Sequence, residues 1–242
     1  MTNHLNVIFL ASEAAPLVKI GGLGDVAGSL PAALRSLPTP VDVRLVLPFY
    51  PQLALDPEEL VPAATFNIAH RDGALLTEVF EIKRQGVPIY LIAGPPVAAS
   101  NAVYSGDHAL DGTKFTYFSL AAMQLARSLN WQPDILHAHD WHASPAVYNL
   151  QLIREHEDFY ADTRSLLTVH NLPYLGHGAE DALEEFGLPP AQDSSLPDWA
   201  QHLPLPLGLL SADKINTVSR GYAREILTPA FGAGLEGFLQ TR

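Results

Sequence analysis

Cysteine is absent from the 242-residue chain, and its absence removes several kinds of chemistry. Without a thiol the protein can form no disulfide framework, no thiolate nucleophile and no cysteine–zinc site. Basic residues are also scarce: 14 Lys and Arg stand against 26 Asp and Glu, a formal net charge of −12. A chain this acidic is a poor candidate for binding the phosphate backbone of DNA or RNA, so we expect no nucleic-acid partner.

Long apolar runs are missing as well. No stretch approaches the ~20 apolar residues of a membrane-spanning helix, so we expect no membrane partner. The amino-terminal segment has no basic cluster, and Asn6 interrupts its apolar run, which favours a first core strand over a signal peptide. These features make the cytoplasm the expected location.

Hydrophobic residues make up 48% of the chain, and the length suits one large α/β domain. Short apolar runs typical of buried strands alternate with segments of helical periodicity. The expected strands are 5–11, 41–47, 79–82, 88–93, 134–137, 165–169 and 214–218, and the expected helices are 25–37, 113–129, 143–156, 179–187 and 219–228. This order predicts an α/β fold with a mostly parallel sheet and helices on both faces.

Two kinds of segment interrupt the alternation. Residues 65–93 are predicted to form a local β excursion, because two apolar runs flank Arg84-Gln85-Gly86. The proline-rich stretches 38–62 and 189–206 are predicted to be irregular connections or short helices that begin at Pro.

Polar clusters follow four of the expected strands. In parallel α/β sheets, ligands bind just beyond the carboxyl ends of the strands. The clusters are Ser12-Glu13, residues 139–142, His170-Asn171 and Ser219-Arg220. One edge of the sheet is therefore predicted to carry the functional site.

A glycine-rich loop from Lys19 to Asp25 follows the first strand and opens a helix. Gly21, Gly22 and Gly24 permit close approach of backbone N–H groups to a ligand. A diphosphate would sit favourably at the helix N-terminus, with Lys19 as the nearby cation. The alternative is a tight turn in which Asp25 caps the helix.

Glu13 stands shortly before this loop. A free carboxylate beside a bound diphosphate would be unfavourable. We therefore expect Glu13 to bond either a sugar or backbone N–H groups, the latter being a structural role in the loop.

Three histidines and an aspartate occur within residues 137–142. With no cysteine, a metal there would need His and carboxylate ligands, and we expect no bound metal. His139 and Asp140, at the strand end, are instead predicted to bind hydroxyl groups of a polar substrate. His137, inside the apolar run, is equally consistent with a core histidine.

The third cluster, His170-Asn171, also ends a strand. His170 can donate or accept a hydrogen bond near a reacting centre, and Asn171 can bond in both directions. The alternative is that Asn171 caps the next turn and His170 packs on the loop.

These blocks together resemble one family. The glycine-rich loop, with Ser12-Glu13-Ala14-Ala15-Pro16 before it, resembles the opening of bacterial glycogen synthases and plant starch synthases. Segments 133–142, 168–174 and 217–226 resemble later blocks of that family in the same order, and 234–237 follows as expected. The family has the GT-B fold, in which two Rossmann-like domains face each other across a cleft. The resemblance implies that residues 1–242 are the N-terminal catalytic domain alone.

The family's reaction is the transfer of glucose from ADP-glucose to the non-reducing end of an α-1,4-glucan, glycogen or starch, with retention of configuration. The resemblance implies this activity, with no cofactor beyond the donor substrate. It also implies a C-terminal nucleotide-binding domain that supplies the adenine pocket, further cations and a catalytic carboxylate. We therefore expect residues 1–242 alone to be inactive, since stabilising a leaving diphosphate needs more positive charge than they carry.

The resemblance also assigns roles on the donor side. By carry-over, Lys19 and the amides of Gly21 and Gly22 hold the donor diphosphate, and Asp25 lies near the donor or acceptor sugar.

On the acceptor side, Asp140 bonds the acceptor hydroxyl. His170 lies beside the glucosyl carbon and helps to stabilise oxocarbenium-like charge, with Asn171 supporting that geometry.

Three departures from the family pattern keep other functions open. Ile20 replaces the usual Thr, segment 98–112 lacks the usual aromatic and Asn-rich acceptor surface, and segment 203–212 lacks the usual Lys-x-Gly. One alternative is a non-catalytic paralogue that binds a glucan or a nucleotide sugar. Others are a GT-B transferase of the sucrose or trehalose type and a His/Asp metal-dependent hydrolase.

Overall fold

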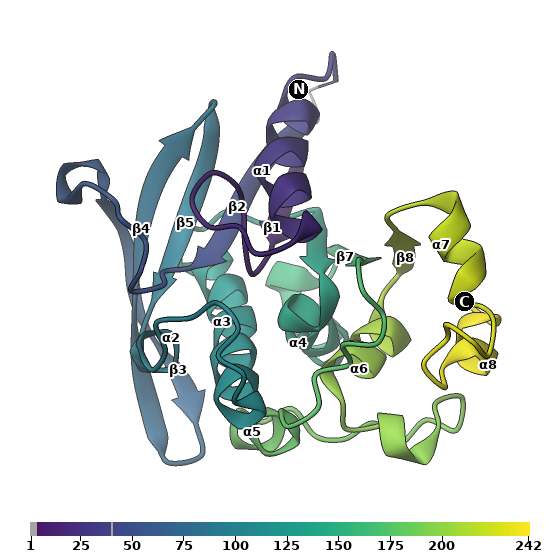
Figure 1. Cartoon of the computed structure of the whole chain (residues 1–242). Helices are drawn as coiled ribbons and strands as arrows, with labels where there is room; N and C mark the ends of the chain where they lie inside the picture. The colour runs from purple at the N-terminus through teal and green to yellow at the C-terminus, as the bar shows by residue number, and fades with distance from the viewer. Residues whose placement is uncertain (1–3, 40) are drawn as a thin grey trace.

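The computed structural model describes residues 4–39 and 41–242, and its centre is one eight-stranded sheet (Figure 1). The strand order is β3-β4-β5-β2-β1-β6-β7-β8. The strands are β1 (Leu5–Leu10), β2 (Val41–Pro48), β3 (Val61–His70), β4 (Gly73–Arg84), β5 (Val87–Ala93), β6 (Ile135–His139), β7 (Arg164–Val169) and β8 (Lys214–Thr217). The helices are α1 (Gly22–Arg35), α2 (Pro95–Ala98), α3 (His108–Ser128), α4 (Asp140–Ile153), α5 (Glu180–Glu185), α6 (Pro204–Ser211), α7 (Arg220–Glu225) and α8 (Glu236–Leu239).

The sheet is mostly parallel, as predicted. Strands β5, β2, β1, β6, β7 and β8 pair in parallel, whereas β3 and β4 add an antiparallel edge. The β excursion is confirmed: β4 and β5 form a hairpin whose turn holds Gln85 and Gly86 at φ of 50° and 76°. Strand β3 was missed, because only Ile68 of its ten residues is buried and its apolar pattern is weak.

Helices cover both faces of the sheet, which confirms the predicted layers (Figure 1). Successive residues of β1 point to opposite faces, so Val7 and Phe9 pack with Leu23 of α1 while Ile8 and Leu10 pack in the larger core with α3 and α4. This two-sided burial explains why the central strands read as continuous apolar runs.

Three helices begin earlier than their periodicity predicted, and the first of them, α1, begins at Gly22 rather than at residue 25. Helix α3 begins at His108 because the Asp107 side chain accepts hydrogen bonds from the backbone of Ala109 and Leu110, each at 3.1 Å. Helix α4 begins at Asp140, whose φ of 56° makes a sharp turn directly from β6. That turn brings the start of α4 to the sheet edge where a site was predicted.

Helix α6 begins near the end of the proline-rich segment 189–206, which was predicted to hold irregular connections or short helices that begin at Pro. It begins at Pro204 and is almost wholly buried, which its apolar sequence explains. No helix in the described ranges is long and apolar enough to cross a membrane.

Candidate active site

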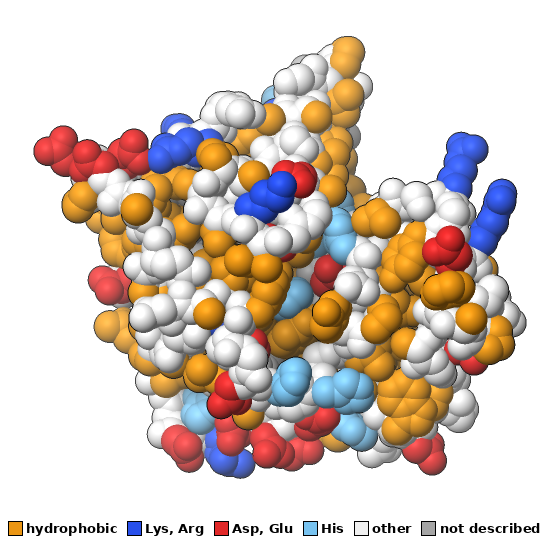
Figure 2. Space-filling view, in the orientation of Figure 1, with side chains coloured by type: hydrophobic (Ala, Val, Ile, Leu, Met, Phe, Trp, Pro, Cys, Tyr) orange, Lys and Arg blue, Asp and Glu red, His pale blue; other side chains and the backbone are white. Residues whose placement is uncertain are grey.

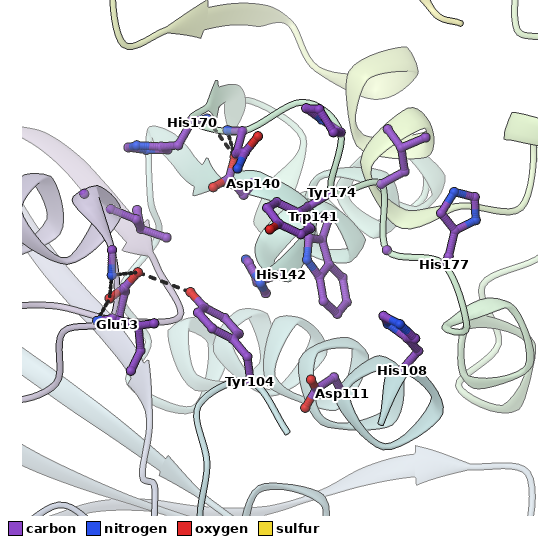
Figure 3. Close-up of a pocket in the computed structure, with 18 of the residues that line it drawn as sticks. Glu13, Tyr104, His108, Asp111, Asp140, Trp141, His142, His170, Tyr174 and His177 are labelled. Carbon is purple, nitrogen blue, oxygen red and sulfur yellow. Dashed lines mark hydrogen bonds between the residues drawn. The ribbon is translucent and has the colours of Figure 1, made fainter. Parts of the chain in front are cut away.

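A cavity of about 790 Å³ opens at the carboxyl ends of the parallel strands, the edge where the site was predicted. Glu13 after β1, Asp140 after β6 and His170 after β7 all line it, so three of the four polar clusters meet there (Figure 3). The fourth cluster, Ser219-Arg220, does not line the cavity. The Ser219 side chain caps α7, and the preceding residue, Val218, lines the cavity. Figure 2 shows the hollow surrounded by hydrophobic and histidine side chains.

Glu13 anchors the glycine-rich loop. Its buried carboxylate accepts the backbone N–H of Gly21, with N–O distances of 3.0 and 3.2 Å, and also that of Ile20. Glu13 therefore bonds backbone N–H groups, one of the two outcomes that the sequence left open. The amide of Gly21, expected to hold a diphosphate, is already engaged, whereas a Cβ at Gly22 would meet nothing within 4 Å.

Tyr104 joins this anchor from another loop. Its hydroxyl donates to Oε1 of Glu13 at 3.3 Å (Figure 3). The same hydroxyl lies 2.8 Å from Oγ of Ser12. Its ring lines the cavity and packs on the ring of His142 at 4.9 Å between centroids. Segment 98–112, expected to lack the family's usual aromatic acceptor surface, thus contributes one aromatic ring to the cavity wall.

Lys19 and Asp25 lie outside the cavity lining. Their side chains form an ion pair with an Nζ–Oδ1 distance of 2.8 Å, and the two side chains are 49% and 60% exposed. The cation predicted to meet a diphosphate thus has a carboxylate partner from the same loop. The N-cap role considered for Asp25 is not observed, because α1 begins at Gly22 and Gly21 is its N-cap residue.

Asp140 ties the end of β6 to the end of β7. Its buried Oδ1 accepts the backbone N–H of His170 at 2.7 Å and that of Asn171 at 3.3 Å. Burial raises the pKa of Asp140 to about 6, and the nearby Glu13 carboxylate adds to the rise while the two backbone bonds oppose it. Asn171 is exposed at the cavity rim.

The three site histidines occupy different depths. His170 is half-buried and lines the cavity, whereas His139 is fully buried beneath it and lines no part of it. Nδ1 of His139 lies 2.9 Å from Nε2 of His170. The structure therefore does not present His139 to a ligand, contrary to its predicted hydroxyl-binding role. His137 lies in the core, with its Nε2 2.8 Å from Oγ1 of Thr168. This agrees with its interpretation as a core histidine.

Burial keeps these histidines neutral. It lowers the pKa of His137 to about 4 and that of His142 to about 3. The pKa of His139 lies well below its ordinary value for the same reason, and burial also lowers the pKa of His170.

A buried ion pair that the sequence analysis missed supports the wall of the cavity. Lys114 is fully buried, with Nζ 2.8 Å from Oδ1 of Asp111, and it donates to the carbonyl oxygens of Ala102 and Val103. Asp111 in turn accepts the backbone N–H of Ser105. The pair thus fixes the loop that carries Tyr104. The sequence did not reveal it, because the i,i+3 spacing of Asp111 and Lys114 is also that of an exposed ion pair on a helix.

Aromatic side chains form much of the remaining wall. Trp141, His142 and Tyr174 line the cavity together with Tyr104 (Figure 3). Trp141 and His142 lie in the segment 137–142, whose histidines and aspartate indicated a site, but neither residue was predicted to bind a ligand. Among the described residues, no three His, Asp or Glu side chains are arranged to hold a metal ion.

This architecture, a mostly parallel sheet with a ligand-sized cavity at its strand ends, is that of one half of a GT-B glycosyltransferase. It matches the catalytic domain of Starch Synthase IV from Arabidopsis thaliana, bound to ADP and acarbose, with a TM-score of 0.84 and 26% identity. The match covers 98% of this chain and 50% of that one. Residues 6–241 also match the starch synthase catalytic domain family, and the chain belongs to that family.

Curated relatives agree with this membership. "Glycogen synthase 2" of Rhizobium meliloti is 37% identical over 250 residues, covering 98% of this chain and 49% of the relative. "Glycogen synthase" of Moorella thermoacetica is 35% identical over 251 residues, covering 100% of this chain and 49% of the relative. The chain spans about half the length of the curated relatives it matches.

Proposed function

We propose that residues 1–242 form the N-terminal, acceptor-side domain of a retaining glucosyltransferase. The enzyme transfers glucose from ADP-glucose to the non-reducing end of an α-1,4-glucan, in glycogen or starch synthesis, and works in the cytoplasm. The observation that carries the proposal is the meeting of the Glu13-anchored loop, Asp140 and His170 in one cavity. The family membership and the ADP and acarbose bound to the Arabidopsis relative support the choice of substrates.

On the donor side, the diphosphate binds at the start of α1. The backbone N–H of Gly22, the first residue of α1, binds a phosphate oxygen, and the helix N-terminus favours negative charge. Lys19 exchanges its Asp25 partner for a phosphate oxygen, and Asp25 then lies near a sugar. The amide of Gly21 donates to the Glu13 carboxylate, and this bond holds the glycine-rich loop in position at the diphosphate.

On the acceptor side, Asp140 binds the glucan. Only its Oδ1 bonds to the described chain, so Oδ2 is free to accept a sugar hydroxyl. His170 lies beside the glucosyl carbon and stabilises the developing positive charge, with Asn171 next to it. Tyr104 and Trp141 give apolar faces on which sugar rings can pack.

A C-terminal domain, corresponding to the half of the relatives' chains that residues 1–242 do not cover, would complete the site. Residues 1–242 carry a net charge of −12, and Lys19 is the cation next to the glycine loop. A departing diphosphate needs stronger electrostatic stabilisation, so the second domain supplies further cations, the adenine pocket and a catalytic carboxylate. These residues alone are therefore inactive, and the reaction uses no cofactor.

The test uses a chimera in which residues 1–242 are joined to the second half of the Rhizobium meliloti protein. With ADP-glucose and glycogen, Lys19→Ala raises the KM for ADP-glucose, because it removes a diphosphate contact, whereas His170→Ala mainly lowers kcat. Unchanged kinetics in both variants contradict the site assignment. Glucan binding without transfer, by a chimera that is folded, supports the non-catalytic alternative instead.

A further inference from the structure

The contact between His139 and His170 fixes more than ring positions. Nδ1 of His139 and Nε2 of His170 are 2.9 Å apart, so they share one proton in a hydrogen bond. A neutral imidazole carries a proton on only one nitrogen. The direction of this bond therefore decides which nitrogen of His170 bears its proton.

The other nitrogen of His139 gives the direction. Nε2 is buried and has no hydrogen-bond partner in the described chain, and the ring of Phe9 packs 4.2 Å from the imidazole. If His139 accepted at Nδ1, its own proton would sit on Nε2 as a buried N–H without an acceptor. Such orphaned donors are rarer in native proteins than unsatisfied acceptors. His139 therefore donates from Nδ1.

The consequence falls on His170. Since its Nε2 accepts this bond, its proton must lie on Nδ1. The side chain lines the cavity, and its Nδ1 makes no hydrogen bond with residues 4–39 or 41–242. A hydrogen-bond donor is therefore available on the ring that faces a ligand.

The neighbouring His137 has the opposite tautomer. Thr168 donates its hydroxyl to Oδ1 of Asn216 at 2.5 Å, so its oxygen accepts from Nε2 of His137 at 2.8 Å. The proton of His137 thus lies on Nε2. Two histidines on one strand are held in different tautomers by different partners, which supplies an internal control.

We propose that His139 is a positioning residue that holds His170 in the Nδ1–H tautomer, so that His170 donates a hydrogen bond to an oxygen of the transferred sugar. The identity of that ligand rests on the proposed function, whereas the tautomer does not. His139, predicted from sequence to bind a hydroxyl itself, acts through His170 instead.

The direct test is a two-bond ¹H–¹⁵N correlation spectrum of the histidine rings in the 242-residue chain, at about pH 8, where the rings are neutral. Proton-bearing and bare ring nitrogens have widely separated ¹⁵N shifts. The expected spectrum shows protons on Nδ1 of His139, Nδ1 of His170 and Nε2 of His137. A bare Nδ1 on His170 overturns the proposal, and this result needs neither a substrate nor a variant.

Two variants separate tautomer control from packing. His139→Asn keeps an N–H donor near the position of Nδ1, so His170 should stay in the Nδ1–H form. His139→Leu removes the donor, so the His170 signals should move toward the average of two exchanging tautomers, while His137 stays unchanged. An unshifted His170 in a folded His139→Leu protein contradicts the role of His139. Because no substrate is present, failure here is distinct from failure of glucosyl transfer.

Discussion

The carboxylate of Glu13 holds the backbone N–H of Gly21 at 3.0 and 3.2 Å, and so binds the loop that begins α1. The same carboxylate accepts the hydroxyl of Tyr104 from the loop after β5 and α2. One buried acid thus connects the glycine-rich loop to the loop that carries Tyr104.

Removing this acid should destabilise the domain. Glu13→Ala leaves the amides of Ile20 and Gly21 without their acceptor, which is expected to lower the free energy of unfolding by about 1–3 kcal/mol. Glu13→Gln keeps one acceptor oxygen and should lose less. Urea unfolding of both variants measures this, with the exposed Glu58→Ala as a control that changes by less than about 0.5 kcal/mol. Equal stability of Glu13→Ala and Glu58→Ala contradicts the anchor.

The buried pair of Lys114 and Asp111 should show strong coupling. Asp111→Asn leaves a fully buried ammonium without its counter-ion, an expected loss of about 3–5 kcal/mol in unfolding free energy. Lys114→Met in the same chain removes the stranded charge, so the double variant should be more stable than Asp111→Asn alone.

Denaturant titration of both single variants and the double variant measures the coupling. Lys83→Met removes an exposed lysine and should change stability by less than about 0.5 kcal/mol. Additive losses in the double variant contradict a coupled pair.

The general plan of the fold, and the meeting of three predicted site residues at one sheet edge, followed from the sequence. Continuous apolar runs predicted the parallel strands, and the rule that ligands bind beyond strand carboxyl ends brought Glu13, Asp140 and His170 to one edge. The structure places all three around one cavity. The order of the strands along the chain and their parallel direction are enough to predict that these residues meet. Neither of these two features depends on how the side chains pack.

The burial of individual side chains could not be predicted from the sequence. His139 and His170 both stand at strand ends, yet one is fully buried and the other faces the cavity. Lys114 and Asp111 have the spacing of a solvent-exposed helix pair, and only the loop folded over α3 buries them. Strand β3 lies at the sheet edge, where burial imposes little pattern on the sequence.

Acid should destabilise the folded chain through its buried histidines. Burial lowers the pKa of His137 to about 4 and that of His142 to about 3, against about 6.5 in the unfolded chain. Between these values the unfolded chain binds protons that the folded chain does not. Each histidine therefore lowers the unfolding free energy by up to about 1.4 kcal/mol per pH unit as the pH falls below about 6.

Asp140 opposes part of this trend. Its pKa of about 6 means that the folded chain takes up one proton as the pH falls toward 4, while the unfolded aspartate stays ionised. Urea unfolding between about pH 7 and pH 4 measures the net slope. Wild-type stability should fall with acid, His142→Gln should reduce the slope, and Asp140→Asn should increase it. A stability independent of pH over this range contradicts the buried neutral histidines.

Two glycines of α1 should respond in opposite ways to alanine. A Cβ at Gly28 would collide with the carbonyl oxygen of Ala15, so Gly28→Ala is expected to cost about 1–3 kcal/mol. A Cβ at Gly22 meets nothing within 4 Å, so Gly22→Ala should keep or slightly raise stability, by up to about 1 kcal/mol. Thermal unfolding of the two variants side by side measures the difference. Equal losses contradict the observed packing of α1 on the loop before it.

The most direct test of the central claim compares residues 1–242 alone with their chimera to the second half of the Rhizobium meliloti protein. The measurement is incorporation of radiolabelled glucose from ADP-glucose into glycogen. We expect incorporation by the chimera, loss of it in the His170→Ala chimera, and none by residues 1–242 alone. Incorporation by residues 1–242 alone, or none by a folded chimera, would contradict the account.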